Sequence, residues 1–473
     1  MSENPNSIPE HVHKIHLIAV CGTGMGALAC MLKSRGYEIS GSDQKIYPPM
    51  SDFLREQGIQ IMNGFDAAHM SYKPDLVIVG NAVTRENPEV KKMKQMGLPF
   101  CSMPQALNRF FAEDKKTLLV SGTHGKTTTA SILAWMLYKG GLDPSFMIGG
   151  ILQNFDSNYR LGDGNAFIIE GDEYDTAFFD KGPKFMHFHP AAAVLTSVEF
   201  DHADIFRDLN HVQKAFSRFL TQLKPSSLLL AFDADENIRR IISEAHCRVQ
   251  FYGNDVHSNW CLGDIQIDAP WSVFEVLKSG QRYGRFKTQM LGRHNLYNAL
   301  AVIAIADNLG ISPAEMEEAL ATFKGVKRRQ QIRGCKNHIT VMDDFAHHPT
   351  AVRETVTAVK SFQSPRRLIA VFEPRTNSSM RDVFQKVYPL AFDDADLICI
   401  RQPPLLEKIP VVERFSSEKL VADLKQRGKD AHFFADTEGI VEFLIQHATP
   451  GDLILVMSNG GFDNIHQKLL DRL

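Results

Sequence analysis

Short apolar runs alternate with longer stretches of helical periodicity along almost the whole chain. Within each run the residues are almost continuously hydrophobic, which is typical of strands buried on both faces of a parallel sheet. Alternation of such strands with helices predicts doubly wound α/β domains. We interpret as strands Ile15–Val20, Leu76–Val79, Leu118–Val120, Phe167–Ile169, Val194–Thr196, Leu228–Ala231, Ile339–Met342, Leu368–Phe372, Leu397–Ile400 and Leu453–Met457.

Two polar links predict a division into three domains. One is the charged segment Ala112–Lys116, and the other is the basic segment Lys324–Arg329. A length of 473 residues also suggests about three domains. We expect a Rossmann-like domain at 1–113, a central nucleotide-binding domain at 114–325 and a second Rossmann-like domain at 326–473. Between Trp260 and Met290 polar and apolar residues alternate more regularly, so the central domain should combine its parallel sheet with a small antiparallel element.

The composition excludes several classes of protein. A formal net charge of −3 leaves no basic surplus for nucleic acid or an anionic membrane. No apolar run approaches the roughly 20 residues that a membrane-spanning helix needs, and Met1–Glu10 is too polar for a secretion signal. The seven cysteines are dispersed, which is typical of reduced thiols. We therefore expect a cytoplasmic protein, and either a monomer or a dimer.

The segment Gly122-Thr123-His124-Gly125-Lys126-Thr127-Thr128 lies between a predicted strand and a predicted helix. In such a loop the backbone N–H groups point at phosphates, Lys126 neutralises them and Thr127 can ligate Mg²⁺. Only two residues separate Gly122 from Gly125, whereas an ordinary P-loop has four residues before its Gly-Lys pair. The segment predicts a nucleoside triphosphate site, and the alternative is a tight structural turn.

Two acidic clusters follow the strands that we place beside this loop. They are Glu170–Asp175 and Glu199–Asp204. Because Mg²⁺ prefers oxygen ligands, Glu170 is the natural first carboxylate, while His202 could help to hold a second ion. We expect Asp201 to orient the imidazole of His202. The alternative is that these acidic residues only cap helices or form turns.

Glycine-rich and polar turns at the ends of other strands are candidate ligand contacts. In the first domain Gly22–Gly26, Asp43 and Gly80–Val83 favour a diphosphate pocket, for a dinucleotide or a nucleotide sugar, over a purely structural turn. Asn295 and Asn298 could face a nucleotide, although Asn295 could equally cap a helix. In the third domain, Asp343–Pro349 could close over a nucleotide.

Other third-domain segments suit a carboxylate substrate. Arg375 is placed to bind a carboxylate bidentately. The segment Ser458–Phe462 could offer backbone N–H groups to another carboxylate. Ordinary polar loops are the alternative for each of these segments.

Over essentially its whole length the chain resembles the Mur ligase family. The resemblance rests on 122–128, Glu170–Asp175, Asp201-His202, Gly292–Asn298, Arg328-Arg329 and Asp343–Pro349, in that order. It implies ATP contacts at Gly122, Thr123, His124, Gly125, Lys126, Thr127, Thr128, Asn295, Asn298, Arg329 and Asp344. It implies Mg²⁺ ligands at Thr127, Glu170 and His202, and catalytic roles for Lys126, Glu170, His202 and Arg329. It implies that a UDP-sugar, not NAD, lies on Gly22, Thr23, Gly24, Met25, Gly26, Ser42, Asp43, Asn81, Ala82 and Val83.

The resemblance also implies an activity. The expected enzyme uses ATP to activate UDP-N-acetylmuramate as an acyl phosphate and joins it to L-alanyl-γ-D-glutamyl-meso-diaminopimelate, a step of peptidoglycan recycling. Peptide contacts are expected at Arg375, Ser378 and Asn459. L-Alanine is the alternative amine, and a non-catalytic nucleotide-sugar binder and an NAD oxidoreductase are the alternative functions. Two positions depart from relatives: Gly171 replaces the usual Ala, and Ser217 stands where several Mur ligases carry a carbamylated lysine.

Overall fold

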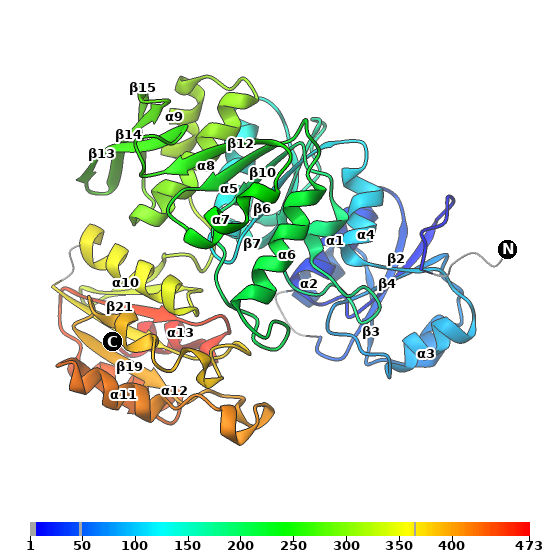
Figure 1. The fold of residues 1–473 in the computed structure, drawn as a ribbon. Coiled ribbons are helices and arrows are strands. Elements are labelled where there is room, and N and C mark those ends of the chain that lie inside the picture. The colour runs from blue at the N-terminus through cyan, green and yellow to red at the C-terminus, as the bar shows by residue number, and fades with distance from the viewer. Residues whose placement is uncertain (1–5, 47–49, 364–365) are drawn as a thin grey trace.

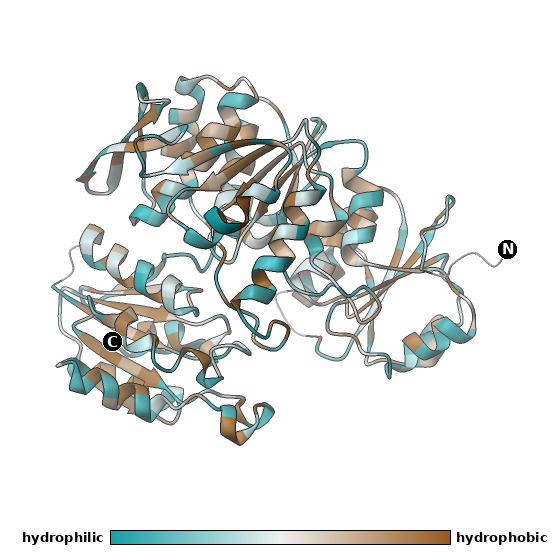
Figure 2. Cartoon of the chain, viewed as in Figure 1, coloured by the Kyte–Doolittle hydropathy of each residue, from teal (hydrophilic) through white to brown (hydrophobic). Residues whose placement is uncertain are grey.

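Three β-sheets, each covered by helices, follow one another along the chain (Figure 1). The computed structural model describes residues 6–46, 50–363 and 366–473, so the first five residues of the polar N-terminal segment lie outside it. Apolar residues concentrate on the strands and on the helix faces that cover them (Figure 2). The predicted α/β class is confirmed. The predicted domain limits at 113/114 and 325/326 fall between the sheets and stay predictions.

The N-terminal sheet is parallel, with the order β3-β2-β1-β4-β5. Because the chain adds β2 and β3 on one side of β1 and β4 on the other, the turns after β1 and β4 meet at one edge of the sheet. The first strand ends two residues before the predicted Val20, since Ala19 adopts a positive φ of 66°. The strands are β1 (Lys14–Ile18), β2 (Glu38–Asp43), β3 (Gln60–Asn63), β4 (Leu76–Val79) and β5 (Phe100–Ser102). The helices are α1 (Thr23–Ser34), α2 (Met50–Glu56), η1 (Ala67–Met70), α3 (Pro88–Gln95), α4 (Met103–Leu107) and η2 (Asn108–Ala112).

The central sheet has ten strands in the order β15-β14-β13-β12-β11-β10-β6-β9-β7-β8. The predicted antiparallel element is confirmed, but it continues the parallel sheet through the pairing of β12 with β13. A second antiparallel hairpin, β7–β8, was not predicted. The strands are β6 (Lys116–Ser121), β7 (Ser145–Leu152), β8 (Ser157–Arg160), β9 (Ala166–Gly171), β10 (Ala192–Leu195), β11 (Leu228–Phe232), β12 (Arg248–Gly253), β13 (Trp260–Asp268), β14 (Trp271–Lys278) and β15 (Gln281–Thr288).

The helices of the central region bury their apolar faces against this sheet and against one another. The helix α8 packs on α5, and its residues from Ala299 to Ala306 are all buried, which explains its apolar sequence. The helices are α5 (Lys126–Lys139), η3 (Lys184–His187), α6 (Leu209–Gln222), α7 (Glu236–Ile241), η4 (Ile242–Glu244), α8 (Arg293–Asn308) and α9 (Pro313–Thr322).

The C-terminal sheet has the order β16-β17-β21-β18-β19-β20 and is parallel except for β16. The neighbours β17, β21 and β18 bring the turns after Asp344, Met457 and Phe372 to one edge. The strands are β16 (Gln331–Lys336), β17 (Ile339–Asp344), β18 (Arg367–Phe372), β19 (Leu397–Arg401), β20 (Asp430–Phe434) and β21 (Asp452–Met457). The helices are α10 (Pro349–Gln363), η5 (Asp382–Phe384), η6 (Tyr388–Phe392), η7 (Leu406–Lys408), η8 (Val411–Glu413), α11 (Ser417–Gln426), α12 (Thr437–His447), η9 (Phe462–Asn464) and α13 (Ile465–Arg472). None of the helices in the described part of the chain is long and apolar enough to cross a membrane.

Candidate active site

The glycine loop lies at the centre of the large sheet, between β6 and the start of α5 at Lys126. Gly122 and Gly125 adopt φ values of 131° and 79°, which L-residues rarely adopt. A Cβ on Gly122 would overlap Thr196 Oγ1, and one on Gly125 would lie 2.9 Å from Asn298 Oδ1. The strand–turn–helix arrangement predicted for this loop is therefore present, and both glycines are required by its geometry.

Lys126 is held beside the loop by an acidic partner, Glu173, that follows β9, the neighbour of β6 in the sheet. Its Nζ donates to Gly122 O at 2.6 Å and to Glu173 Oε2 at 2.8 Å. Burial lowers the pKa of Lys126, but the carboxylates of Glu173 and Asp172 outweigh it, so the pKa is raised and the amine stays charged. The register of β6 beside β9, with Val120 opposite Glu170, brings these groups together.

Glu173 was not singled out from the sequence. Only its position within the cluster Glu170–Asp175 pointed to it. Its side chain is 2% exposed, and its Oε1 lies 3.4 Å from His202 Nε2. Burial raises the pKa of Glu173, but Lys126 and His202 overcome this effect, so the pKa is lowered and the carboxylate stays ionised.

Thr127 and Glu170 present adjacent oxygen atoms at the start of α5. Thr127 Oγ1 donates to Glu170 Oε2 at 3.0 Å, and Gly149 N donates to the other carboxylate oxygen at 2.6 Å. Burial and then Asp172 raise the pKa of Glu170. A hydroxyl beside a carboxylate suits Mg²⁺, and these contacts bring together two of the three predicted metal ligands. No hydrogen bond or ion pair joins the third, His202, to Glu170 within the described residues.

The expectation that Asp201 orients the imidazole of His202 is wrong. Asp201 Oδ1 accepts a hydrogen bond from the backbone N–H of His202 at 2.7 Å, and Oδ2 lies 3.7 Å from His347 Nε2. His202 has a φ of 51°, and its ring lies against Tyr174 and Glu173. The side chain of Asp201 therefore stabilises the backbone turn at His202 and faces His347 of the C-terminal domain.

The four other predicted ATP contacts converge behind the loop. Asn298 Nδ2 donates to Asn295 Oδ1 at 3.2 Å, and Asn295 Nδ2 donates to Gln330 Oε1 at 3.2 Å. The backbone N–H of Gln330 donates to Asp344 Oδ2 at 2.8 Å, and the Arg329 guanidinium lies over the Phe345 ring. Gly292 is the N-cap of α8, so the interpretation of Asn295 as a cap is wrong.

The predicted sugar-binding residues lie at the edge of the N-terminal sheet where β1, β2 and β4 end. Asp43 accepts hydrogen bonds from the backbone N–H groups of Cys21 at 2.9 Å and Lys45 at 3.0 Å. Ser42 is fully buried and donates to Glu89 at 2.6 Å, so its hydroxyl faces the domain interior.

Two further contacts join these segments to the rest of the protein. Asn81 Nδ2 donates to Asp175 O at 3.0 Å, which links the first domain to the acidic cluster. Thr23 O accepts a hydrogen bond from Asn158 at 3.3 Å. The side chain of Met25 is buried, as is that of Val83, whereas Ala82 is exposed.

The predicted peptide contacts lie on neighbouring turns of the C-terminal sheet. Arg375 Nη1 is 3.6 Å from Glu373 Oε2, beside the turn at Gly460. Ser378 Oγ accepts a hydrogen bond from the backbone N–H of Ala203 at 3.0 Å. Asn459 Oδ1 is buried without a hydrogen-bond partner in the described structure, so it is available to a donor group.

His348 lies where the C-terminal domain meets the segment after β10, with its Nε2 3.1 Å from Phe200 O. Its buried imidazole makes the stability of the protein depend on pH. Burial and then His124 lower its pKa to about 3, although Asp201 and Glu199 act in the opposite direction. Because a histidine in the unfolded chain has a pKa of about 6.5, the unfolded chain binds more protons below that pH, and acid destabilises the fold.

We expect the stability contributed by His348 to be complete above about pH 6.5 and to decrease by about 1.4 kcal/mol per pH unit on acidification. Urea titrations between pH 6.5 and 5 should show this slope, and His348→Asn should reduce it. Identical slopes for the two proteins would contradict the assignment.

Comparison with known proteins identifies the family. Residues 14–115 match the model described as "Mur ligase family, catalytic domain", residues 120–306 the "Mur ligase middle domain", and residues 327–460 the "Mur ligase, glutamate ligase domain". The UDP-N-acetylmuramate–L-alanyl-γ-D-glutamyl-meso-2,6-diaminoheptandioate ligase of Escherichia coli K12 is 40% identical, over 97% of this chain and 98% of its own length. The UDP-N-acetylmuramate–L-alanine ligase of Acetivibrio thermocellus is 32% identical, over 98% of this chain and 96% of its own.

Solved structures of Mur ligases are similar to this chain over almost its whole length. The murein peptide ligase of Psychrobacter arcticus has a TM-score of 0.73 and 33% identity, covering 98% of both chains. The UDP-N-acetylmuramate–alanine ligase of Thermotoga maritima has a TM-score of 0.79 and 25% identity, covering 98% of this chain and 99% of its own. With family models matching all three regions and a relative at 40% identity over nearly the whole length, this chain belongs to the Mur ligase family.

Proposed function

We propose that this protein joins UDP-N-acetylmuramate to L-alanyl-γ-D-glutamyl-meso-diaminopimelate in the cytoplasm, at the cost of ATP, as a step of peptidoglycan recycling. As a Mur ligase it is an ATP-dependent enzyme that forms an amide bond. The observation that carries the choice of amine is the 40% whole-length identity to the E. coli tripeptide ligase, against 32% for the alanine ligase. L-Alanine remains the second candidate, because the alanine ligase of T. maritima has the higher TM-score, 0.79 against 0.73.

The loop fits a triphosphate. Gly122 and Gly125 allow a tight loop whose conformation a side chain at either position would disrupt, and α5 begins at the end of this loop with its N-terminal N–H groups. We propose that Lys126 leaves Glu173 for the transferring phosphoryl group and stabilises the charge that develops on it. Asn295, Asn298, Arg329 and Asp344 are proposed to position the rest of ATP.

The oxygen donors of Thr127 and Glu170 fit Mg²⁺ better than a softer ion. When bound there, Mg²⁺ would supply Lewis-acid stabilisation of the phosphate charge. Gly149 holds the second oxygen of Glu170, which orients the carboxylate toward Thr127. His202, turned toward Glu173, is proposed to join a metal site only after a change in its ring position.

The acceptor amine is proposed to arrive from the C-terminal sheet edge. Arg375 would bind a carboxylate of the tripeptide. Asn459 Oδ1 would accept a hydrogen bond from an N–H group of the tripeptide, since this oxygen is buried and unpartnered among the described residues. Attack of the tripeptide amine on the acyl phosphate would then form the amide and release phosphate. The sugar nucleotide would lie across the β1/β4 edge, near Asn81.

The amine assay tests this proposal. The purified protein is incubated with ATP, Mg²⁺ and UDP-N-acetylmuramate, and either the tripeptide or L-alanine is added. We expect phosphate release and UDP-N-acetylmuramoyl-tripeptide with the tripeptide, and at least about a hundredfold lower kcat/KM with L-alanine, because Arg375 and Asn459 would lack their partners. Equal or faster turnover with L-alanine would overturn the choice of amine.

A further inference from the structure

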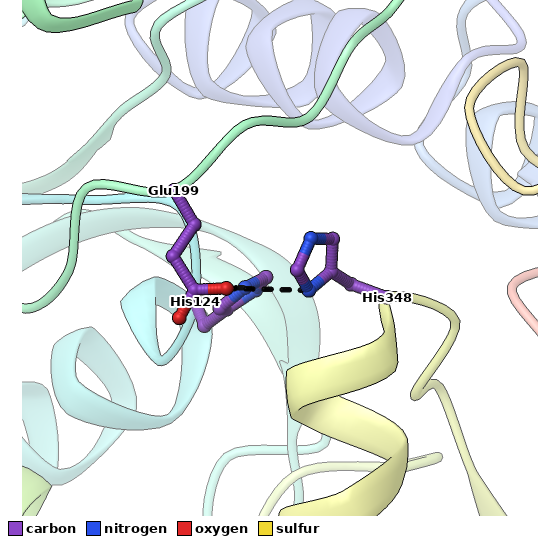
Figure 3. Close-up of side chains that lie close together, drawn as sticks. All are labelled: His124, Glu199 and His348. Carbon is purple, nitrogen blue, oxygen red and sulfur yellow. Dashed lines mark ion pairs between the residues drawn. The ribbon is translucent and has the colours of Figure 1, made fainter. Parts of the chain in front are cut away.

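A separate cluster of side chains lies where the central and C-terminal regions meet. It consists of His124 in the glycine loop, Glu199 after β10 and His348 directly before α10 (Figure 3). One ligand atom from each residue lies within 4.8 Å of those of the other two. In the described part of the chain, no other group of three His, Cys, Asp or Glu side chains has this spacing.

The distances in this cluster are close to those around a metal ion. His124 Nε2 lies 3.5 Å from Glu199 Oε2, and His348 Nδ1 lies 3.6 Å from the same oxygen. A tetrahedral Zn²⁺ with bonds of about 2.0–2.1 Å places its ligand atoms about 3.4 Å apart. Two of the three ligand-to-ligand distances therefore need almost no adjustment.

Each histidine has a ring nitrogen that a metal could use. His124 Nε2 is buried and has no hydrogen-bond partner among the described residues. His348 Nε2 lies 3.1 Å from Phe200 O and donates to it, so the lone pair is on Nδ1. The Thr350 N–H points at this lone pair from 3.3 Å, a long contact that a metal would replace.

The carboxylate is held in place as well. Thr350 Oγ1 donates to Glu199 Oε2 at 2.7 Å, and Glu199 N donates to Thr123 Oγ1 at 2.8 Å. Outer contacts of this kind orient metal ligands in established sites. Two imidazoles and one carboxylate suit Zn²⁺, whereas Mg²⁺ prefers oxygen ligands alone.

We propose that His124, Glu199 and His348 form a Zn²⁺ site that bridges the glycine loop and the C-terminal domain. Water completes the coordination. Because His124 belongs to the loop and His348 to the start of α10, a bound Zn²⁺ ties the two domains together in this arrangement. Because His124 belongs to the loop proposed to bind ATP, Zn²⁺ at this position inhibits ligation, a consequence that rests on the proposed function.

Equilibrium dialysis of the full-length protein against Zn²⁺ buffers, without ATP or Mg²⁺, tests the site directly. We expect the unmodified protein to bind one Zn²⁺ per chain. The affinity for Zn²⁺ should be at least about tenfold lower in Glu199→Gln and in His348→Gln, since even the loss of a residue that only orients a metal ligand costs about 10–100-fold. His347→Gln is the matched control, because His347 is adjacent in sequence but faces Asp201 at 3.7 Å. It should bind Zn²⁺ as the unmodified protein does. Co²⁺ in place of Zn²⁺ should give the visible absorption of a tetrahedral site.

Equal Zn²⁺ affinity in the unmodified protein and in both ligand variants would overturn the proposal, as would an equal loss in His347→Gln. Circular dichroism checks folding, and the near-isosteric Glu199→Gln keeps the test decisive if His348→Gln misfolds. A protein that binds Zn²⁺ through these residues but has no ligase activity would contradict the proposed function and leave the site standing. A protein that has ligase activity but does not bind Zn²⁺ would contradict the Zn²⁺ site and leave the proposed function standing.

Discussion

Replacement of Lys126 by Ala is expected to lower ligase turnover by about a thousandfold or more. The side chain is the cation of the glycine loop, and loss of one such charge-stabilising group typically costs about 10²–10⁵-fold in rate. Phosphate release with ATP, UDP-N-acetylmuramate and tripeptide measures the effect. Lys116→Ala is the matched control, because Lys116 is exposed at the start of β6, the strand that leads into the glycine loop. It should stay within about twofold of the unmodified protein.

The same substitution removes the lysine that pairs with the buried carboxylate of Glu173 and leaves it only the imidazole of His202, 3.4 Å away. We expect a loss of up to about 3 kcal/mol of stability, because an uncompensated buried charge is costly. The double variant Lys126→Ala with Glu173→Gln should recover much of that stability and none of the activity. Retention of more than a tenth of the activity by Lys126→Ala would contradict the assigned role. Recovery of activity in the double variant would show that the lysine acts only structurally.

Replacement of Gly122 by Ala is expected to be almost as damaging. An alanine would have to adopt a φ near 131° and would come within 2.8 Å of Ser197 N and 2.9 Å of Ser197 O, so the loop must move. A displacement of about 1 Å at a catalytic group can cost about a hundredfold in rate. We expect kcat to fall by at least that factor, with weaker ADP binding in a thermal-shift titration.

Gly182→Ala provides the control for this variant. A Cβ on Gly182 meets no heavy atom within 4 Å, and no positive φ is required there. Its activity and its response to ADP should match those of the unmodified protein. Unchanged ADP binding in Gly122→Ala would show that the glycine loop is not the phosphate site.

Much of the fold follows from local patterns. Continuous apolar runs such as Leu76–Val79 can be read as buried strands because a buried parallel strand needs apolar residues on both faces. Strands with mixed composition, such as Gln60–Asn63, were missed because their side chains are only partly buried. The antiparallel hairpin β7–β8 was missed for a related reason, since Gly149 and Gly150 interrupt its pattern.

The sequence by itself determined that a Lys-Thr pair follows a glycine loop and that acidic clusters follow two later strands. It also determined the family, because motif order and spacing are properties of the chain. Only the tertiary structure decided which groups meet. Glu173 pairs with Lys126, and Asp201 faces His347 instead of the imidazole of His202. It also brings the rings of His348 and His124 into contact, although the two residues are 224 positions apart in the sequence. That contact depends on how two separate sheets pack against each other. Strand order and domain packing are non-local, so no spacing rule along the chain can supply them.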